Sequence, residues 1–153
     1  LAPVNAYLNI IGMETLGLRM ERVCNNAFRL AQALEKLEGV SVNYPLLESS
    51  PYHELAEKQL SGKGGAILTI RAGSKERAYK LINHLKYVKI ATNIGDVRTL
   101  VIHPASTIYI HSTPEAMEEA GVYDDTIRIS VGIEDIKDLI KDFTEAVESL
   151  GEE

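Results

Sequence analysis

The stretch from Thr126 to Leu150 constrains the fold more than any other part of the chain, because its apolar residues change their spacing within it. From Thr126 to Gly132 apolar and polar residues alternate, as in a β-strand that buries one face. The residues on the apolar face are Ile127, Ile129 and Val131. From Ile133 onward the apolar residues recur every three or four positions, which predicts a helix with one buried side. That side consists of Ile133, Ile136, Leu139, Ile140, Phe143, Ala146, Val147 and Leu150.

The turn between this strand and helix is predicted at Gly132. Glu134 and Asp135 would then lie in the first helical turn, where the helix dipole favours negative charge. Gly151 is expected to end the helix, because glycine adopts the left-handed conformation that closes many helices.

Arg128 lies on the opposite face of the strand, and two interpretations of it are open. The guanidinium either is solvated on an open sheet face, or binds a planar anion through two parallel hydrogen bonds. Periodicity alone does not choose between them.

Length and charge narrow the class of protein. The 153 residues correspond to one domain, and the apolar runs are far shorter than the ~20 residues that cross a membrane. A net charge of −6 without a run of Lys and Arg argues against a nucleic-acid partner. The single cysteine, Cys24, excludes a disulfide within the chain and predicts a packing residue in a cytoplasmic, reducing compartment. Because the chain begins at Leu1, we expect it to be a piece of a longer protein.

A long helix is predicted from Pro3 to Leu37, ended by Gly39. Gly12 and Gly17 each cost about 1 kcal/mol relative to alanine and mark a candidate bend. The first part of this helix is apolar nearly all round, so it needs a second surface to cover it. The segment 1–22 is therefore expected to connect to, and pack on, something outside this chain.

The other elements follow from alternation, capping residues and glycine-rich turns. In chain order we predict a strand over 40–44, a helix over 53–60, a strand over 66–71, a helix over 75–86, strands over 88–92 and 99–103, and a short helix over 114–120. Ser74 and Thr113 are the predicted N-caps. The order predicts an α+β fold: a two-layer sandwich with helices on one face of a mostly antiparallel sheet of four or five strands. The other face would be bare or covered by something absent from this chain.

Most familiar catalytic patterns are missing. The glycines at 62–65 precede a strand, whereas a phosphate-binding loop follows one and opens a helix. The four histidines form no metal-binding spacing, so no metal site is predicted. A Ser/His/Asp triad can be assembled on paper from Ser106, His103 and Asp96, but no nucleophile-elbow pattern accompanies it.

Polar loop residues at the ends of the predicted strands remain as candidates for a functional site. The segments 93–96 and 103–107 flank the same pair of strands, and Arg128 lies in a third strand. Amides, hydroxyls and one guanidinium that converge at a sheet edge are typical of an anion receptor, and no base with an arranged partner accompanies them.

Several segments resemble one known family. Residues 93–107, Asn-Ile-Gly-Asp-Val-Arg-Thr-Leu-Val-Ile-His-Pro-Ala-Ser-Thr, resemble the signature of the Cys/Met-metabolism pyridoxal-phosphate enzymes. Leu18-Arg19-Met20, Asn43-Tyr44-Pro45 and the segment 128–134 match the same family in the same order. Within it, the Asn-x-Gly-Asp and His-Pro-Ala-Ser-Thr segments most resemble the O-acetylhomoserine sulfhydrylases. Cystathionine γ-synthases, cystathionine γ-lyases and methionine γ-lyases usually carry Ser-Leu-Gly at 93–95.

The resemblance implies a substrate site. The family's arginine at Arg128 binds the substrate α-carboxylate, and Asn93 and the backbone of Ile94 stand where relatives make further carboxylate contacts. The chain departs from the family after Thr107, because Ile108-Tyr109 replaces the usual Thr-His. Either Thr107 substitutes for the missing threonine or the loop is shifted.

The resemblance covers only the family's small C-terminal domain. In the full enzymes a larger upstream domain holds pyridoxal 5′-phosphate (PLP) on a lysine in a Ser-x-Thr-Lys context, which none of the nine lysines here has. Residues 1–153 would therefore be one substrate-binding domain that is catalytically silent and binds no cofactor alone. The implied whole is a homotetrameric transferase of methionine biosynthesis that converts O-acetylhomoserine and sulfide to homocysteine and acetate by γ-replacement. The alternatives are a domain of a related synthase or lyase, a non-catalytic binding module, or an oligomerisation domain.

Overall fold

A five-stranded sheet forms the centre of the computed structural model, which describes residues 1–151. Its spatial order is β1-β2-β5-β4-β3, and every neighbouring pair is antiparallel except β3 with β4. The strands are β1 (Ser41–Asn43), β2 (Ile67–Arg71), β3 (Lys89–Ile90), β4 (Leu100–Ile102) and β5 (Thr126–Ser130). The predicted α+β fold with a mostly antiparallel sheet is confirmed.

The register around β5 decides which residues share a face. Arg128 stands opposite Thr69 of β2 on one side and Ile102 of β4 on the other. Because successive residues of a strand point to opposite faces, these three share one face of the sheet. Ile127 and Ile129 lie on the other face and are completely buried. The alternation in the sequence therefore predicted the two faces of the central strand correctly.

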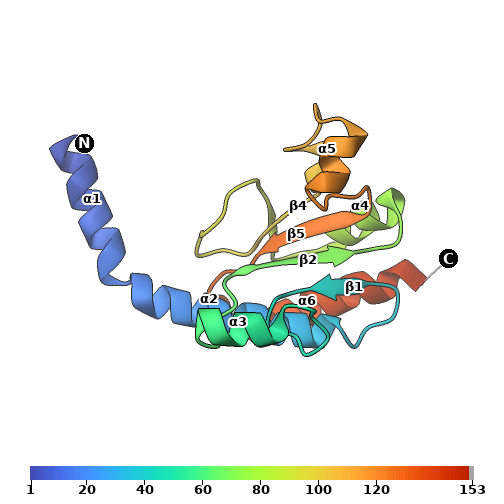
Figure 1. The fold of residues 1–153 in the computed structure, drawn as a ribbon, viewed down its shortest axis with the longest axis horizontal. Helices are drawn as coiled ribbons and strands as arrows, with labels where there is room; N and C mark the ends of the chain where they lie inside the picture. Colours follow the sequence, from blue (N-terminus) through green and yellow to red (C-terminus); the bar gives the residue numbers. More distant parts are fainter. Residues whose placement is uncertain (152–153) are drawn as a thin grey trace.

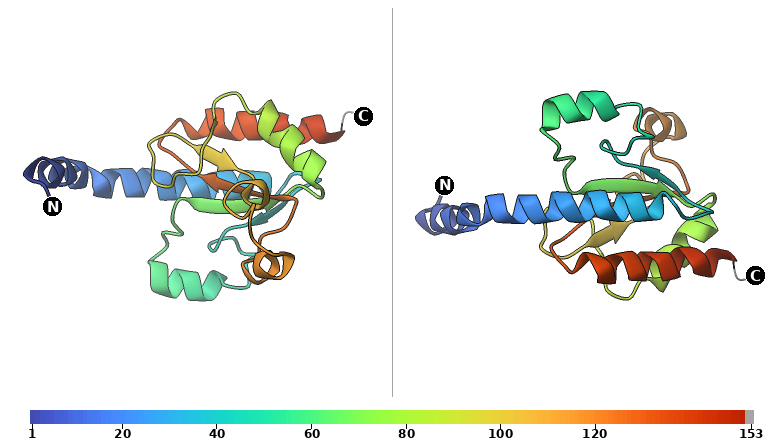
Figure 2. Two further views of the ribbon diagram at one scale, coloured as in Figure 1. Left: turned by 90° about the horizontal axis from the view of Figure 1, so that it is seen from above. Right: turned by 90° about the horizontal axis from the view of Figure 1, so that it is seen from below.

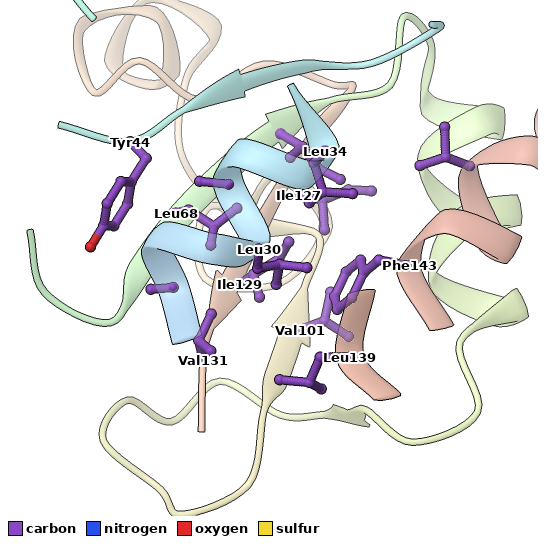
Figure 3. Close-up of a cluster of buried hydrophobic side chains, with 14 of the residues drawn as sticks. Leu30, Leu34, Tyr44, Leu68, Val101, Ile127, Ile129, Val131, Leu139 and Phe143 are labelled. Carbon is purple, nitrogen blue, oxygen red and sulfur yellow. The ribbon is translucent and has the colours of Figure 1, made fainter. Parts of the chain in front are cut away.

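Helices cover the face that carries Ile127 and Ile129 (Figures 1 and 2). They are α2 (Leu16–Leu34), α4 (Lys75–His84) and α6 (Ile136–Glu148), with α3 (His53–Leu60) contributing Ala56 to the same core. Figure 3 shows side chains from α2, α6 and three strands meeting between the two layers. The largest fully buried members of this core include Tyr44, Phe143, Leu30, Leu34, Leu68, Ile127, Ile129 and Leu139.

The opposite face of the sheet is not bare. Leu100 and Ile102 lie on it, yet they are only 4% and 1% exposed. The 3₁₀ turn η1 (Pro104–Ser106) contacts β5, and Figure 1 shows α5 (Pro114–Glu119) on the side of the sheet away from α2 and α6. The expectation of a face left uncovered by this chain is thus wrong over β4, because the connection from β4 to β5 returns across it.

The predicted N-terminal helix is two helices. α1 (Pro3–Glu14) and α2 meet at Thr15, whose backbone is not helical, between Gly12 and Gly17. α2 ends at Leu34 instead of Leu37. No residue of α1 is buried, and the helix projects away from the sheet (Figures 1 and 2). Within residues 1–151 no helix is long and apolar enough to span a bilayer.

The last helix begins three residues later than its apolar spacing predicted. α6 starts at Ile136, and the side chain of Asp135 caps it by accepting a hydrogen bond from the N–H of Lys137 at 2.8 Å. Glu134 lies outside the helix, because its carboxylate binds Thr99. At the other end the chain continues from Glu148 into the 3₁₀ turn η2 (Ser149–Gly151), so Gly151 does not directly end α6 as predicted.

The predicted bounds and caps of the shorter helices and strands agree well with the structure. α3 has the predicted bounds, and the side chains of Ser74 and Thr113 cap α4 and α5 as predicted. α4 ends at His84 instead of Lys86, and β1, β3 and β4 are shorter than their alternating segments. β1 and β3 are the two edge strands and each pairs with one neighbour only, whereas β4 lies between β5 and β3.

Candidate functional site

The guanidinium of Arg128 has one hydrogen-bonded nitrogen and one buried nitrogen without a partner. Its side chain is half-buried, and one terminal nitrogen, Nη2, donates a hydrogen bond to the carbonyl of Thr92 at 2.8 Å. Its Nε is buried and has no hydrogen-bond partner, and among residues 1–151 no carboxylate forms an ion pair with the guanidinium. It carries the only buried side-chain nitrogen or oxygen in that range without a partner.

An unpaired buried N–H is costly, at about 1–3 kcal/mol, and more for a charged group. The planar guanidinium offers Nε and a terminal nitrogen side by side, which matches the two oxygens of a carboxylate. A carboxylate at this position would satisfy the orphaned donor and neutralise the charge. The arrangement is chemically suited to bind an anion.

The loop that runs from Thr92 to Arg98 lies beside this guanidinium. Its first carbonyl is the acceptor for Arg128, so Asn93 and Ile94 follow directly after the contact. Both are exposed, and the amide of Asn93 forms no hydrogen bond with the described part of the chain. Asn93 and Ile94 thus lie one and two positions after the carbonyl that Arg128 contacts.

The middle of this loop is shaped by its own backbone. Gly95 has a φ of 83°, and its N–H donates to the hydroxyl of Ser130 at 3.4 Å. Asp96 accepts from the N–H of Arg98 at 2.9 Å, which closes a local turn. The bond to Ser130 ties the loop to the face of β5 that carries Arg128, because Ser130 and Arg128 are two residues apart.

Thr107, the fourth predicted residue, is engaged elsewhere. Its hydroxyl donates to the carbonyl of His103 at 2.8 Å, within its own turn. No hydrogen bond joins Thr107 to Arg128 in the structure as described for residues 1–151. The hydroxyl proton is therefore occupied, and Thr107 supports the turn after β4.

His103 is buried and bonded at both ring nitrogens. Nδ1 accepts from the N–H of Ser106 at 3.2 Å and lies 2.9 Å from the Ser106 hydroxyl, while Nε2 lies 2.6 Å from the carbonyl of Asp124. Asp96 takes no part in this arrangement, so the triad drawn from the sequence is not formed. His103 instead joins the two ends of the segment between β4 and β5.

The lysines of this chain do not fit the role of holding PLP. A lysine that carries a cofactor as a Schiff base is held in a site that shifts its pKa and excludes water. All nine lysines here are exposed at the surface. None of the nine lysines therefore lies in an environment suited to holding PLP.

Glu134, Thr99 and Asn26 form a network that the sequence analysis missed. The Glu134 carboxylate accepts from the N–H of Thr99 at 2.5 Å and from its hydroxyl at 2.9 Å. Asn26 of α2 donates to the carbonyls of Gly132 and Glu134 at 3.0 and 2.9 Å. Asn26 could have been noticed as a polar residue on the apolar side of α2, three positions after Val23 and four before Leu30.

Comparisons with known proteins agree on one family. The model of the family described as Cys/Met metabolism PLP-dependent enzyme matches residues 1–148. Homocysteine synthase of Schizosaccharomyces pombe is 47% identical over 148 residues, which cover 95% of this chain and 34% of the relative. O-acetyl-L-homoserine sulfhydrylase 1 of Thermus thermophilus is 43% identical over 96% of this chain and 35% of its own length. L-methionine γ-lyase of Fusobacterium nucleatum is 40% identical over 98% of this chain and 38% of its own length.

Solved structures show the same relationship. A Campylobacter jejuni protein assigned as an O-acetylhomoserine (thiol)-lyase, with N′-pyridoxyl-lysine-5′-monophosphate in its structure, superimposes with a TM-score of 0.92 at 37% identity. The match covers 97% of this chain and 36% of that one. The O-acetylhomoserine sulfhydrylase of Wolinella succinogenes gives a TM-score of 0.81, also at 37% identity, over 96% of this chain and 39% of its own. The chain thus spans little more than a third of the length of these relatives. It belongs to the family of Cys/Met metabolism PLP-dependent enzymes.

Proposed function

We propose that this chain is the domain that binds the substrate α-carboxylate in a PLP-dependent O-acetylhomoserine sulfhydrylase. The observation that carries the proposal is the buried, unpartnered Nε of Arg128, on the face of β5 opposite the helical core. Asn93 and the backbone of Ile94 are proposed to contribute further polar contacts to the same carboxylate. Thr107 is proposed to act only through the turn that it supports, because its hydroxyl already donates to His103.

The rest of the site is proposed to lie in an upstream domain. In that arrangement residues 1–153 form the C-terminal domain, and residues 1–22 connect it to the domain that binds PLP. When bound, PLP supplies an electron sink for reactions at the substrate's amino-acid carbons. The share of this chain is binding and orientation, which lowers the entropic part of the barrier. The chain alone is proposed to be inactive.

The choice of reaction rests on two segments and on the relatives. The Asn-x-Gly-Asp and His-Pro-Ala-Ser-Thr segments favour γ-replacement on O-acetylhomoserine with sulfide, and two of the relatives are named for that substrate or its product. Methionine γ-lyases at 40% identity are the reason to keep γ-elimination as the second candidate. Assaying the longer protein with O-acetylhomoserine plus sulfide and, separately, with methionine distinguishes the two.

Arg128→Lys in the longer protein tests the carboxylate site. Lysine keeps the charge but loses the planar fork, so we expect the KM for the amino-acid substrate to rise about 10- to 100-fold, which corresponds to the ~1.5–3 kcal/mol of a charged hydrogen bond. The measurement is steady-state kinetics with the amino-acid substrate varied. A KM equal to that of the parent would remove Arg128 from the site.

Arg29→Lys is the matched control. Arg29 is an exposed arginine on α2, in the layer on the other side of the sheet from Arg128. The same chemical change there is expected to leave KM and kcat within twofold of the parent.

We also propose that the protein assembles into a homo-oligomer, and the exposed apolar residues of α1 support this. A cytoplasmic location is proposed as well, and the free cysteine Cys24 supports it.

A further inference from the structure

We infer that Glu134 is a positioning residue for the carboxylate site: its carboxylate fixes the loop from Thr92 to Arg98 against the end of β5, so that the loop and Arg128 present one surface. The inference rests on the function proposed for Arg128. Glu134 is half-buried, and its carboxylate oxygens are engaged by Thr99. Its effect passes through Thr99.

The Glu134 carboxylate accepts two hydrogen bonds from Thr99. One carboxylate oxygen accepts from the Thr99 N–H at 2.5 Å, and the other accepts from its hydroxyl at 2.9 Å. The same hydroxyl accepts from the N–H of Gly132 at 3.0 Å. Thr99 is completely buried, so each of these groups would lack a water partner if Glu134 were removed. The base of the loop is therefore held by hydrogen bonds that solvent cannot easily replace.

The loop and the turn after β5 also approach each other closely. The N–H of Ile133 donates to the carbonyl of Val97 at 2.9 Å. A Cβ built on Gly132 would lie 2.4 Å from the Val97 carbonyl oxygen, so the two backbones leave no room for a side chain. Three successive residues, Gly132, Ile133 and Glu134, thus contact the base of the loop.

The turn that carries Glu134 is fixed on its other side. Its carbonyl accepts from Asn26 at 2.9 Å and from Arg22 at 3.1 Å, and both donors belong to α2. Glu134 therefore cannot follow the loop if the loop moves, because its backbone is bound to the helical layer. It acts as a fixed point between the core and the substrate face.

The far end of the loop reaches Arg128. The Thr92 carbonyl is the one protein acceptor for that guanidinium among the hydrogen bonds of residues 1–151. Thr92 lies just after β3, and the N–H of Ala91 donates to the carbonyl of Val101 at 3.2 Å, so this end of the loop is anchored to β4. Loosening the loop at Thr99 would leave the Thr92 carbonyl positioned from its β3 end, so the Arg128 fork would be oriented less tightly. Substrate binding should weaken, whereas a bound substrate should react at nearly the normal rate.

Glu134→Gln in the longer protein is the test. Glutamine can still accept from the Thr99 N–H, but its amide nitrogen can only donate, so the Thr99 hydroxyl proton loses its acceptor. We expect the KM for the amino-acid substrate to rise about 3- to 10-fold with kcat within twofold of the parent. A fall in kcat at unchanged KM would overturn the inference.

A matched pair at Thr99 covers the case in which Glu134→Gln folds poorly. Thr99→Ser keeps the hydroxyl and should leave KM near that of the parent. Thr99→Val removes the hydroxyl at similar volume and should raise KM as Glu134→Gln does. Equal KM values for the serine and valine variants would overturn the inference.

The double variant Glu134→Gln/Arg128→Lys separates this inference from the proposed function. If Glu134 acts through Arg128, the two KM effects should not multiply, since the oriented fork is already lost. Effects that multiply fully, with Arg128→Lys still raising KM alone, would overturn the positioning role and leave the carboxylate site intact. Arg128→Lys without any effect on KM would instead overturn the function on which the inference rests. Asp138→Asn, at an exposed position on α6, is the control for removing one negative charge.

Discussion

Tyr44 shows how one residue can combine apolar packing with a satisfied polar group. It is among the largest fully buried side chains, and Figure 3 shows its ring at the edge of the core. Its hydroxyl donates to the carbonyl of Gly65 at 2.9 Å. A Cβ on Gly64 would lie 2.6 Å from that hydroxyl, so the turn between α3 and β2 packs directly on the phenol. Burial raises the pKa of the Tyr44 phenol well above its usual value, with a smaller contribution from nearby Cys24.

Tyr44→Phe should change stability in two separable ways. Near neutral pH we expect a loss of about 1 kcal/mol in the free energy of unfolding, because the bond to Gly65 is gone. The folded state keeps the phenol neutral, while the unfolded state ionises it near pH 10, so the parent loses stability as pH rises above about 10. The phenylalanine variant should lose less over the same range. Urea denaturation between pH 8 and 11 measures both effects, and parallel declines would contradict the second.

The face on which a strand residue lies can be predicted from the sequence when the apolar residues of that strand alternate strictly. Strict alternation from 126 to 132 is enough to assign Arg128 to the face opposite Ile127 and Ile129. The same method placed Glu134 in the first turn of a helix, because its partner Thr99 is 35 residues away and leaves no local signal. Whether Arg128, Asn93, Ile94 and Thr107 bind a carboxylate stays a prediction until the kinetic tests above.

At the scale of elements, Asp142 connects two helices. It lies on α6, is 2% exposed, and accepts from the backbone N–H of Lys86 and of Tyr87, in the turn after α4. Those donors lie beyond the end of α4 and have no helical partner. The carboxylate thus determines how α4 and the following edge strand meet the core.

Asp142→Ala should therefore be strongly destabilising. Two N–H groups lose a charged acceptor at a position that is largely closed to water, and we expect a loss of about 2–3 kcal/mol in the free energy of unfolding. Asp138→Ala, at an exposed position of the same helix, should change stability by less than about 0.5 kcal/mol. Chemical denaturation of both variants is the measurement, and equal losses would show that Asp142 has no special role.

The spacing of apolar residues alone did not predict where the helices begin and end. The break at Thr15 lies between two glycines that the sequence marked as a bend, and Arg19 fixes it by donating to the carbonyl of Gly12 at 2.6 Å and to the Thr15 hydroxyl at 3.3 Å. The start of α6 was missed because the side chain of Asp135 caps the helix, whereas Gly132, directly before Ile133, has no side chain to cap with. Capping by a side chain overrides apolar spacing at the start of α6, whereas the break at Thr15 has no side-chain cap and is stabilised by Arg19.

At the scale of the whole molecule, the strands were predictable but their order was not. The central pair, β2 with β5, joins segments about 60 residues apart, and alternation says nothing about which strands pair. The path from β4 back across the sheet likewise depends on His103 bonding to the carbonyl of Asp124. The architecture was correct because the sequence of helices and strands admits few layered arrangements.

The apolar helix α1 contributes no buried residue to the folded core. The exposed fractions of apolar residues on α1 include 65% for Val4, 63% for Tyr7, 60% for Leu8 and 60% for Met13. An apolar surface of this kind is normally covered by a partner. We therefore expect the isolated chain 1–153 to self-associate as its concentration rises, and a chain that begins at Thr15 to associate far less.

The truncation should leave the folded core unchanged, because no residue of α1 is buried. We expect the midpoint of thermal unfolding, measured at low protein concentration, to shift by no more than about 2 °C. Sedimentation velocity over a range of concentrations measures the association of both chains. If the intact chain stays monomeric at all concentrations, α1 does not need a partner to be soluble. If the truncated chain unfolds at a much lower temperature, α1 stabilises the core of this domain and does not serve as a connection to another domain.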